Sequence, residues 1–255
     1  MEIITRDSKY DIAKIAARKA VALLNRAIEE KGRANIIIAT GASQDKFLDS
    51  LKNEGKEESV DWTKVSVFHL DEYIGISEDH PASFRKYLKE HFLNIVGPVE
   101  EVHFVVGDSK NPSEECKRIG SIIADKEIDI AFVGIGENGH LAFNDPPADF
   151  TIKAPYLVVD LDEQCRMQQV NEGCFPDLKD VPEKAISMSV RQIMKSKNII
   201  CSVPDLRKAE AVKNCLEKEI SDQYPASILR EHPSCFVYLD KDSSSLLQRE
   251  NTNNR

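Results

Sequence analysis

Short apolar runs of strand length alternate along this chain with longer stretches that have the period of an α-helix. The clearest of these runs extends from Ile128 to Ile135 and is almost continuously apolar. Runs of this kind are typical of a parallel sheet whose two faces are both covered by helices. The alternation therefore predicts an α/β fold that is doubly wound, with a mostly parallel sheet and helices on both faces.

The predicted elements follow one another as far as about residue 240. The predicted strands are residues 35–39, 64–70, 102–106, 128–135, 156–161, 198–203 and 235–239. The predicted helices are residues 8–30, 46–51, 81–92, 112–126, 191–194, 206–217 and 226–230. No internal repeat and no convincing linker divides the chain, so we predict one domain over residues 1–240. Residues 241–255 are polar and lack a core pattern, which predicts a flexible tail.

Composition and charge argue against several classes of protein. The formal net charge of -9 is unsuited to nucleic-acid binding, and an anionic substrate would need a local positive site. The apolar runs are too short to cross a bilayer, and the N-terminus lacks the pattern of a secretion signal, so we expect a cytoplasmic protein with no membrane partner. The six cysteines show no C-x-x-C pair and no zinc-ligand spacing, which favours a structural role for all of them.

The ends of the predicted strands are the places to look for chemistry, because ligands of open α/β sheets bind beyond the carboxyl ends of the strands. Thr40, Gly41, Ala42 and Ser43 follow the first strand and precede a helix, an arrangement that suits a phosphate. Ordinary capping of that helix by Ser43 explains the same pattern equally well. Lys208, after a later strand, is a candidate cation for the same phosphate, although most lysines are solvated surface charges.

A pair of carboxylates, Asp71 and Glu72, ends the strand predicted over residues 64–70. A carboxylate at the mouth of a parallel sheet can have its pKa tuned by burial and act as a general base. For a bare pair of acidic residues, capping of a following turn is the more common role. We therefore take Asp71 as a candidate base and Glu72 as a candidate substrate contact.

The glycine-rich turn at residues 134–147 follows the most apolar strand and presents His140 at the sheet edge. Glycines such as Gly139 let the backbone turn sharply and approach a ligand closely. Asn138 lies two residues before the histidine and Asp145 five residues after it. An imidazole can pass a proton in both directions near neutral pH, and a neighbouring carboxylate fixes its tautomer. This setting makes His140 a better catalytic candidate than an isolated histidine.

Taken together, these segments resemble the glucosamine-6-phosphate deaminase (isomerase) family. The matching pieces are TGAS at Thr40, FHLDEYIGI at Phe68, EDHPASF at Glu78, GIGENGHLAFNDP at Gly134 and VPEKAI at Val181. They stand in the family's order and cover most of the chain from about residue 35 to residue 215. Each piece alone is moderately specific, and the DEY and GHLAFN segments in this order are highly specific.

The resemblance implies a Rossmann-like fold and an enzyme that isomerises and deaminates an amino-sugar 6-phosphate, with no cofactor and no metal. It implies that Asp71 moves a proton between C2 and C1 and that His140 opens the pyranose ring. Asn138 and Asp145 take the positions that orient and tune this histidine. The segment from Thr40 to Ser43 and the side chain of Lys208 take the positions of phosphate ligands. Family members are often oligomers, so a homo-oligomer is expected.

Three positions depart from the pattern of the well-known bacterial members. Asn138 stands where those proteins carry aspartate, so one negative charge near the histidine is missing. Asp145 stands where they carry glutamate, which shortens the carboxylate arm by one methylene. The family's phosphate-binding arginine has no clear equivalent. Arg166 is the nearest in kind, and Arg191 is a second possibility.

Several functions stay open at this level. Glucosamine 6-phosphate, giving fructose 6-phosphate and ammonia, is the leading substrate, and galactosamine 6-phosphate is an alternative. A lactone hydrolase of the 6-phosphogluconolactonase type shares the overall fold and a glycine–histidine turn, but would not need the Asp71 motif. A non-catalytic sugar-phosphate sensor is the third alternative. Such sensors carry a helix-turn-helix segment for which this chain has no spare residues.

Overall fold

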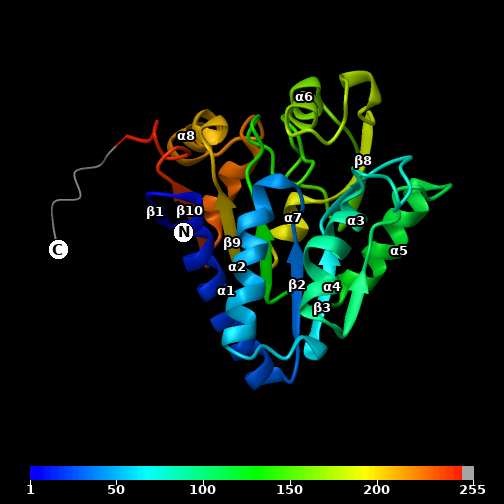
Figure 1. Ribbon diagram of the computed structural model, residues 1–255. Helices are drawn as coiled ribbons and strands as arrows, with labels where there is room; N and C mark the ends of the chain where they lie inside the picture. Colours follow the sequence, from blue (N-terminus) through cyan, green and yellow to red (C-terminus); the bar gives the residue numbers. More distant parts are fainter. Residues whose placement is uncertain (249–255) are drawn as a thin grey trace.

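A computed structural model describes residues 1–248, and its main sheet has seven strands in the order β1-β10-β9-β6-β2-β3-β5. Every neighbouring pair in this sheet runs parallel. The strands are β1 (Glu2–Arg6), β2 (Ala34–Ile38), β3 (Val65–His69), β5 (Glu101–His103), β6 (Ile130–Val133), β9 (Asn198–Val203) and β10 (Cys235–Asp240). Because all these strands point the same way, their carboxyl ends meet along one edge of the sheet (Figure 1).

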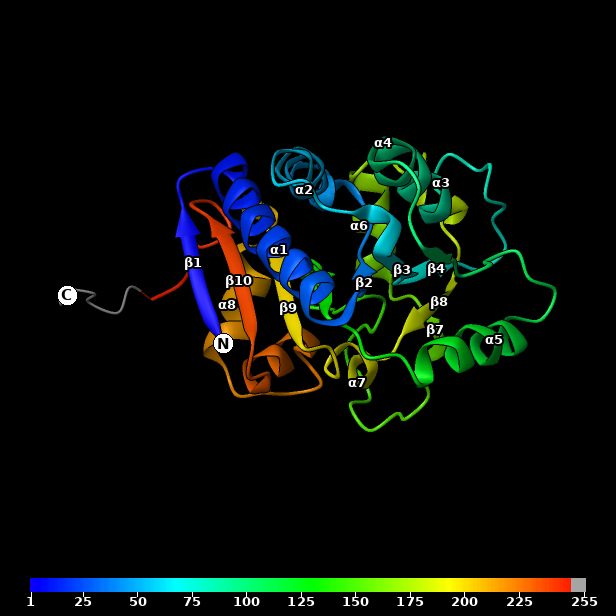
Figure 2. The same cartoon turned by 90° about the horizontal axis from the view of Figure 1, so that it is seen from below.

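Helices cover both faces of the sheet, as Figure 2 shows from below. The helices α1 (Lys9–Lys31) and α2 (Asp45–Glu57) pack together on one face. On the other face lie α5 (Pro112–Ala124), α7 (Val190–Ile193) and α8 (Ala209–Glu217). Successive side chains of a strand point to opposite faces, so β2 contributes to both cores. Its Ile36 and Ile38 pack against α1 and α2, whereas Ile37 packs on the opposite side.

Local signals fix the ends of the longest helix. The Ser8 side chain accepts a hydrogen bond from the backbone N–H of Asp11 at 3.2 Å, which caps the N-terminus of α1. Gly32 ends the helix in the left-handed conformation, with φ of 73°, and its N–H donates to the carbonyl of Ile28. Between these caps a stripe of mostly alanine side chains is buried, which lets α1 lie close to the sheet.

A second, antiparallel sheet of three strands lies beyond the carboxyl edge of the main sheet. It consists of β4 (Asp71–Tyr73), β8 (Lys184–Met188) and β7 (Tyr156–Asp160), in that order. The helix α6 (Glu163–Asn171) follows β7, and in Figure 1 it lies above the arrowheads of the main sheet. An aromatic cluster that includes Tyr73, Phe143 and Phe175 forms the core of this region.

The remaining elements are short. They are α3 (Phe84–Leu88), a π-helical turn (Lys89–Leu93), α4 (Asn94–Val96), and 3₁₀ turns at Ala42–Gln44, Trp62–Lys64, Leu178–Asp180, Leu206–Lys208 and Pro225–Glu231. Within residues 1–248, no helix is both long and apolar enough to cross a membrane.

The predicted doubly wound fold with a mostly parallel sheet is confirmed, and the structure corrects several element boundaries. The strand predicted over 64–70 ends at His69, after which the chain enters the second sheet as β4. The helix predicted over 81–92 begins at Phe84, because Ser83 occupies its N-cap. The elements β1, β8 and α6 were not predicted. The first is a largely exposed edge strand, and the sequence of α6 has little amphipathic period.

The C-terminal boundary also moves. Residues 241–248 were expected to begin a flexible tail, but they form turns against the body of the protein. Ser243 is fully buried and exchanges hydrogen bonds with Asp240, and Leu247 packs against the main core. Residues 249–255 of the predicted tail lie outside the described residues.

Candidate active site

One pocket opens at the carboxyl edge of the main sheet, where the segments that follow β2, β3, β6 and β9 come together. The second sheet and α6 close its far side. Its lining includes the expected residues Thr40, Gly41, Ser43, Asp71, His140 and Lys208. The parallel register therefore brings together candidates that are up to 168 positions apart in the sequence.

Asp71 is the first residue of β4, and its side chain faces this pocket. The residue is only 6% exposed, and none of residues 1–248 donates a hydrogen bond to its carboxylate. Burial, and then the negative charge of Glu72, raise the pKa of Asp71 from 3.8 to about 8. A carboxylate that is partly protonated near neutral pH is suited to accept a proton from a substrate and to return it.

Glu72 points the opposite way, as alternation along β4 requires, and does not line the pocket. Its carboxylate accepts hydrogen bonds from the backbone N–H groups of Phe84 and Arg85, at 3.1 and 2.9 Å, at the start of α3. It also accepts one from the Ser83 hydroxyl and forms a buried ion pair with Arg85. The position of Glu72 therefore does not support the expected substrate contact. It supports the other role considered for this pair of carboxylates, which is capping of the next helix, α3.

His140 lies on the glycine-rich turn after β6, and its ring packs against the backbone of Gly136. A Cβ atom at Gly136 would stand only 2.2 Å from the imidazole, so the turn needs glycine there. The ring Nδ1 lies 2.8 Å from Asp145 Oδ1. Burial raises the pKa of Asp145, but hydrogen bonds from His140, Asn138 and the backbone of Asp162 outweigh it and lower the pKa. The ionised Asp145 thus accepts the Nδ1 proton and leaves Nε2 as the ring nitrogen available to the pocket.

Asn138 does not touch the imidazole ring. Its Oδ1 accepts the backbone N–H of His140 at 3.1 Å, and its Nδ2 donates to Asp145 Oδ1 at 2.9 Å and to Asp162 Oδ2 at 2.8 Å. Asp162 is also the N-cap residue of α6. The amide of Asn138 therefore bridges two carboxylates and ties the histidine turn to α6, which the sequence did not predict.

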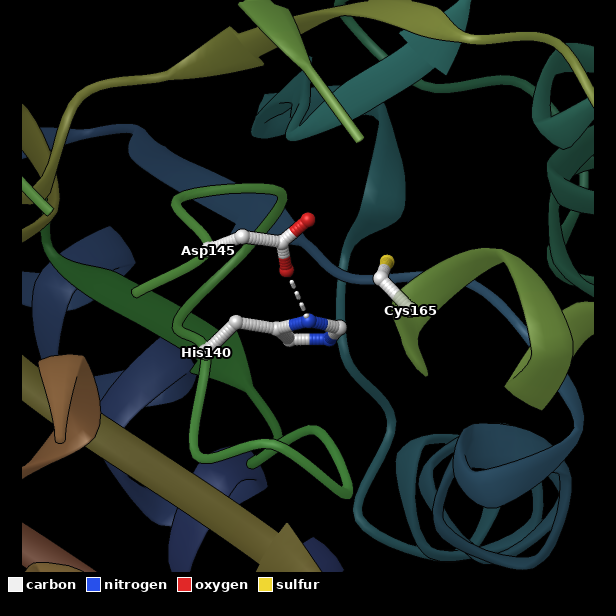
Figure 3. Close-up of side chains that lie close together, drawn as sticks. All are labelled: His140, Asp145 and Cys165. Atoms are coloured by element: carbon white, nitrogen blue, oxygen red, sulfur yellow. Dashed lines mark hydrogen bonds and ion pairs between the residues drawn. The ribbon is translucent and has the colours of Figure 1, made fainter. Parts of the chain in front are cut away.

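Cys165, on α6, completes the surroundings of the histidine (Figure 3). Its Sγ, a ring nitrogen of His140 and a carboxylate oxygen of Asp145 lie within 4.8 Å of one another. Burial, and then the charges of Asp145 and Asp162, raise the pKa of the Cys165 thiol well above its usual range. Cys165 packs in the aromatic cluster of this region, beside the hydrogen-bonded pair of His140 and Asp145.

The other end of the pocket is suited to an anion. Lys208 is 2% exposed, and no hydrogen bond or ion pair joins its Nζ to any part of the chain that the structure describes. Burial lowers the pKa of Lys208, and the charges of Glu172 and Glu137 partly offset this effect. The buried hydroxyl of Thr40 also lacks a partner within residues 1–248. An oxyanion placed here would satisfy both groups.

Four residues of the expected phosphate and substrate set lie outside this lining, and they are Ala42, Glu72, Gly139 and Arg166. Ala42 is exposed in the 3₁₀ turn that follows β2. Gly139 has φ of 87°, and its carbonyl accepts the N–H of Ala226, so it shapes the turn instead.

Neither expected arginine reaches the pocket. The guanidinium of Arg166 donates to the carbonyls of Leu178 and Val181, and Arg191 is exposed on α7. Arg207 lies beside the lining, with its guanidinium 3.7 Å from the carboxylate of the lining residue Glu172. The sequence prediction of Arg166 as a phosphate ligand is therefore not supported by its position.

Sequence reasoning also missed one whole wall of the pocket. Gln168, Gln169 and Glu172 lie on one face of α6 and line the cavity. These residues belong to a polar helix that gave no clear periodic signal. Their spacing of three and four positions was the signal available, but only once a helix had been recognised.

The fold is that of an α/β protein with a parallel sheet, and its pocket brings together a carboxylate, an imidazole and a lysine ammonium. A family model described as glucosamine-6-phosphate isomerases/6-phosphogluconolactonase matches residues 7–237. The chain belongs to this family, which confirms the resemblance seen in the sequence.

Relatives of known name agree with this assignment. The glucosamine-6-phosphate deaminase of Shouchella clausii is 34% identical over 90% of this chain and 92% of its own length. Glucosamine-6-phosphate deaminase 1 of Bacillus subtilis is 33% identical over 96% of this chain and 99% of its own length.

Solved structures give the same picture. A protein described as a monomeric glucosamine-6-phosphate deaminase superposes with a TM-score of 0.87 at 30% identity, covering 96% of this chain and 100% of its own. A 6-phosphogluconolactonase from Shewanella baltica has a TM-score of 0.75 at 17% identity, covering 94% of this chain and 97% of its own. At that identity the second likeness concerns the fold alone.

Proposed function

We propose that this protein converts glucosamine 6-phosphate and water into fructose 6-phosphate and ammonia. The observation that carries the proposal is that Asp71, His140 and Lys208 face one pocket, each with a polar atom that has no partner within residues 1–248. These three groups supply a base, a two-way proton carrier and a cation. The names of the relatives favour the same substrate.

The phosphate binds at the Lys208 end. The buried ammonium and the unpartnered Thr40 hydroxyl meet the phosphate oxygens, together with the backbone at Gly41 and the Ser43 side chain. This contact lies away from the reacting carbons, so its binding energy is used to position the open sugar chain. It also overcomes the repulsion expected from the net charge of -9.

His140 opens the pyranose ring. Its free Nε2 accepts the proton of the anomeric hydroxyl and returns a proton to the ring oxygen, which breaks the C1–O5 bond and gives the aldehyde. Asp145 holds the ring through Nδ1 and stabilises the imidazolium that forms in between. Asn138 and Asp162 act through Asp145 and are therefore positioning residues.

Asp71 then carries out the isomerisation. Its carboxylate removes the proton from C2 while O1 takes up a proton from water, which gives an enolamine, and the resulting acid returns the first proton to C1. The product is a protonated imine at C2. Water adds to this carbon, a proton passes from the added oxygen to the nitrogen, and ammonia then leaves as the second hydroxyl proton returns to water and a ketone remains. The C–N bond is thus cleaved by water after an isomerisation, which unites the isomerase and hydrolase aspects of the reaction.

A lactonase uses neither the proton transfer between C2 and C1 nor a base that can reach both carbons. The placement of Asp71 in the pocket therefore favours the deaminase over the 6-phosphogluconolactonase alternative. Three points stay predictions. They are the choice between glucosamine and galactosamine 6-phosphate, two sugars that differ at C4, the cytoplasmic location, and the homo-oligomer. The neighbour with the TM-score of 0.87 is described as monomeric.

The direct test is ammonia release from glucosamine 6-phosphate and from galactosamine 6-phosphate, with Asp71→Asn as the inactive control. We expect release from the first substrate and its loss in the variant. Release from neither substrate, together with hydrolysis of 6-phosphogluconolactone, would replace the proposal with the lactonase. Release from galactosamine 6-phosphate alone would replace the substrate but keep the mechanism.

A second test isolates the ring-opening step. His140→Gln should slow turnover of the closed-ring substrate by about 100-fold or more, in line with the usual contribution of a general acid–base group. An analogue that cannot close its ring should lose much less. Equal losses on both substrates would contradict the role assigned to His140.

A further inference from the structure

The wall of the pocket formed by α6 contains polar groups that the proposed function does not use. Gln168 has a partner at each end of its amide: its Oε1 accepts the backbone N–H of Glu137 at 3.0 Å, and its Nε2 donates to Glu172 Oε1 at 2.9 Å. Glu172 itself also lies 3.7 Å from the guanidinium of Arg207. That leaves Gln169, which is 5% exposed and lines the same pocket as Asp71 and His140.

The orientation of the Gln169 amide is set by Tyr73, a residue outside the pocket lining. The hydroxyl of Tyr73, a residue that is fully buried, donates to Gln169 Oε1 at 2.6 Å. Burial raises the pKa of Tyr73 well above its usual range, so the phenol keeps its proton and acts as the donor. In this arrangement the amide oxygen faces Tyr73, and the Nε2 group faces away from it.

No acceptor within residues 1–248 takes a hydrogen bond from Gln169 Nε2. Nε2 is also not among the described buried atoms that lack a partner, so it is open to the pocket. A buried amide held in one orientation, with two N–H donors left free, requires an oxygen acceptor when the site is filled. The pocket thus contains a fixed donor in addition to the groups that carry the proposed chemistry.

The position of this donor within the pocket indicates which substrate oxygen it meets. Tyr73 lies two residues after Asp71 on β4, so both side chains are on the same face of that strand. Gln169 is therefore held on the wall that carries the general base. Lys208 and Thr40, the groups suited to phosphate, come from the segments after β9 and β2.

We propose that Gln169 is a substrate-binding residue that donates a hydrogen bond from Nε2 to a hydroxyl oxygen of the open sugar chain, and that Tyr73 is the positioning residue that orients it. This inference rests on the proposed function, because it concerns the same substrate. It adds a specificity-determining contact on α6, a helix that carries none of the proposed catalytic groups.

Four variants test this proposal by steady-state ammonia release: Gln169→Leu, Tyr73→Phe, the double variant, and Gln164→Leu as a control on an exposed position of the same helix. Gln169→Leu keeps the size of the side chain but removes the donor, so kcat/KM for glucosamine 6-phosphate should fall about 10-fold. Tyr73→Phe keeps the packed ring but removes the hydroxyl, which allows the Gln169 amide to rotate, so kcat/KM should fall about 3-fold. The double variant should match Gln169→Leu, and Gln164→Leu should match the wild type.

Competitive inhibition by inorganic phosphate separates a hydroxyl contact from a phosphate contact. The inhibition constant should be the same in Gln169→Leu and in the wild type. An inhibition constant that rises along with the loss of kcat/KM would overturn the hydroxyl assignment and place the amide in the phosphate site. An unchanged kcat/KM in Gln169→Leu would overturn the contact itself, and additive losses in the double variant would overturn the role of Tyr73.

Two further outcomes are distinguishable. A wild type that releases ammonia from neither amino-sugar phosphate would refute the proposed function, and the inference about Gln169 would fall with it. If urea unfolding shows that Gln169→Leu does not fold, Tyr73→Phe carries the test. In that case the expected fall in kcat/KM has to appear in Tyr73→Phe, although Tyr73 itself does not line the pocket.

Discussion

Replacing Asp71 by asparagine should remove activity and at the same time stabilise the protein. The carboxylate is held in a buried site with no donor from residues 1–248, so its ionised form is costly in the folded state. The raised pKa of about 8, against 3.8, means that the folded state keeps the proton where the unfolded chain has lost it. Stability therefore falls as the pH rises between these two values.

The size of the effect follows from the two pKa values. Linkage gives a cost of about 2 kcal/mol at pH 5 and about 5 kcal/mol at pH 8, relative to a group that does not titrate. Asparagine has nearly the same shape and no charge, so Asp71→Asn does not carry this cost. The stability difference between the variant and the wild type should therefore grow by about 3 kcal/mol from pH 5 to pH 8.

Urea unfolding at both pH values measures this difference, and Asp79→Asn, in an exposed turn, is the matched control. The control should change stability by the same small amount at both pH values. A stability difference for Asp71→Asn that does not depend on pH would refute the argument that Asp71 is held in a costly state. The same raised pKa predicts that kcat/KM of the wild type falls as the pH drops below about 8, because the base becomes protonated.

Three further predictions concern other buried groups. Lys208→Met should raise KM about 100-fold, because the phosphate loses its cation. The same change should stabilise the protein without substrate by about 1 kcal/mol in thermal unfolding, because the buried ammonium has no partner within residues 1–248. An unchanged KM would exclude Lys208 from the phosphate site. Asn138→Asp should lower the free energy of unfolding in urea by about 2–3 kcal/mol and shift the acid limb of the pH–rate profile, because three carboxylates would then lie side by side. Adding Asp162→Asn to this variant should restore part of the stability. No restoration would contradict the bridge from Asn138 to Asp145 and Asp162. Burial, and then the charge of Arg85, lower the pKa of His69 to about 3, so as the pH falls from 7.5 to 5 the unfolded chain gains a proton there that the folded protein does not. This contribution destabilises the folded state by about 2 kcal/mol over that range, against the opposite contribution of Asp71. His69→Leu should therefore gain about 2 kcal/mol more stability than the wild type from pH 7.5 to pH 5, and an equal pH dependence of the two would refute it.

The sequence allowed six of the seven strands of the main sheet and three polar side chains of the pocket to be predicted, and the reason is topological. In a parallel sheet every strand end meets the same edge, so Asp71, His140 and Lys208 could be brought together without any knowledge of distances. The same reasoning did not separate Asp71 from Glu72. Only the start of the second sheet decides which carboxylate faces the pocket and which one caps α3.

Other features depend on tertiary contacts that no local pattern records. Arg166 was preferred to Arg191 as the phosphate-binding arginine, but its guanidinium donates to the carbonyls of Leu178 and Val181. Asn138 was expected to act on the imidazole, whereas its partners are Asp145 and Asp162. The contribution of α6 was missed because a polar helix over a polar pocket has no apolar stripe.

The junction of the two sheets has a mechanical consequence. The proposed base, Asp71, is the first residue of the small sheet, whereas His140 lies on a turn that follows a strand of the large sheet. A single residue, Leu70, separates β3 of the large sheet from β4 of the small one. Any tilt of one sheet against the other changes the spacing between the two proton carriers without disturbing either sheet internally. Substitutions along that seam can therefore alter turnover while the phosphate contact, which depends on the large sheet, stays the same.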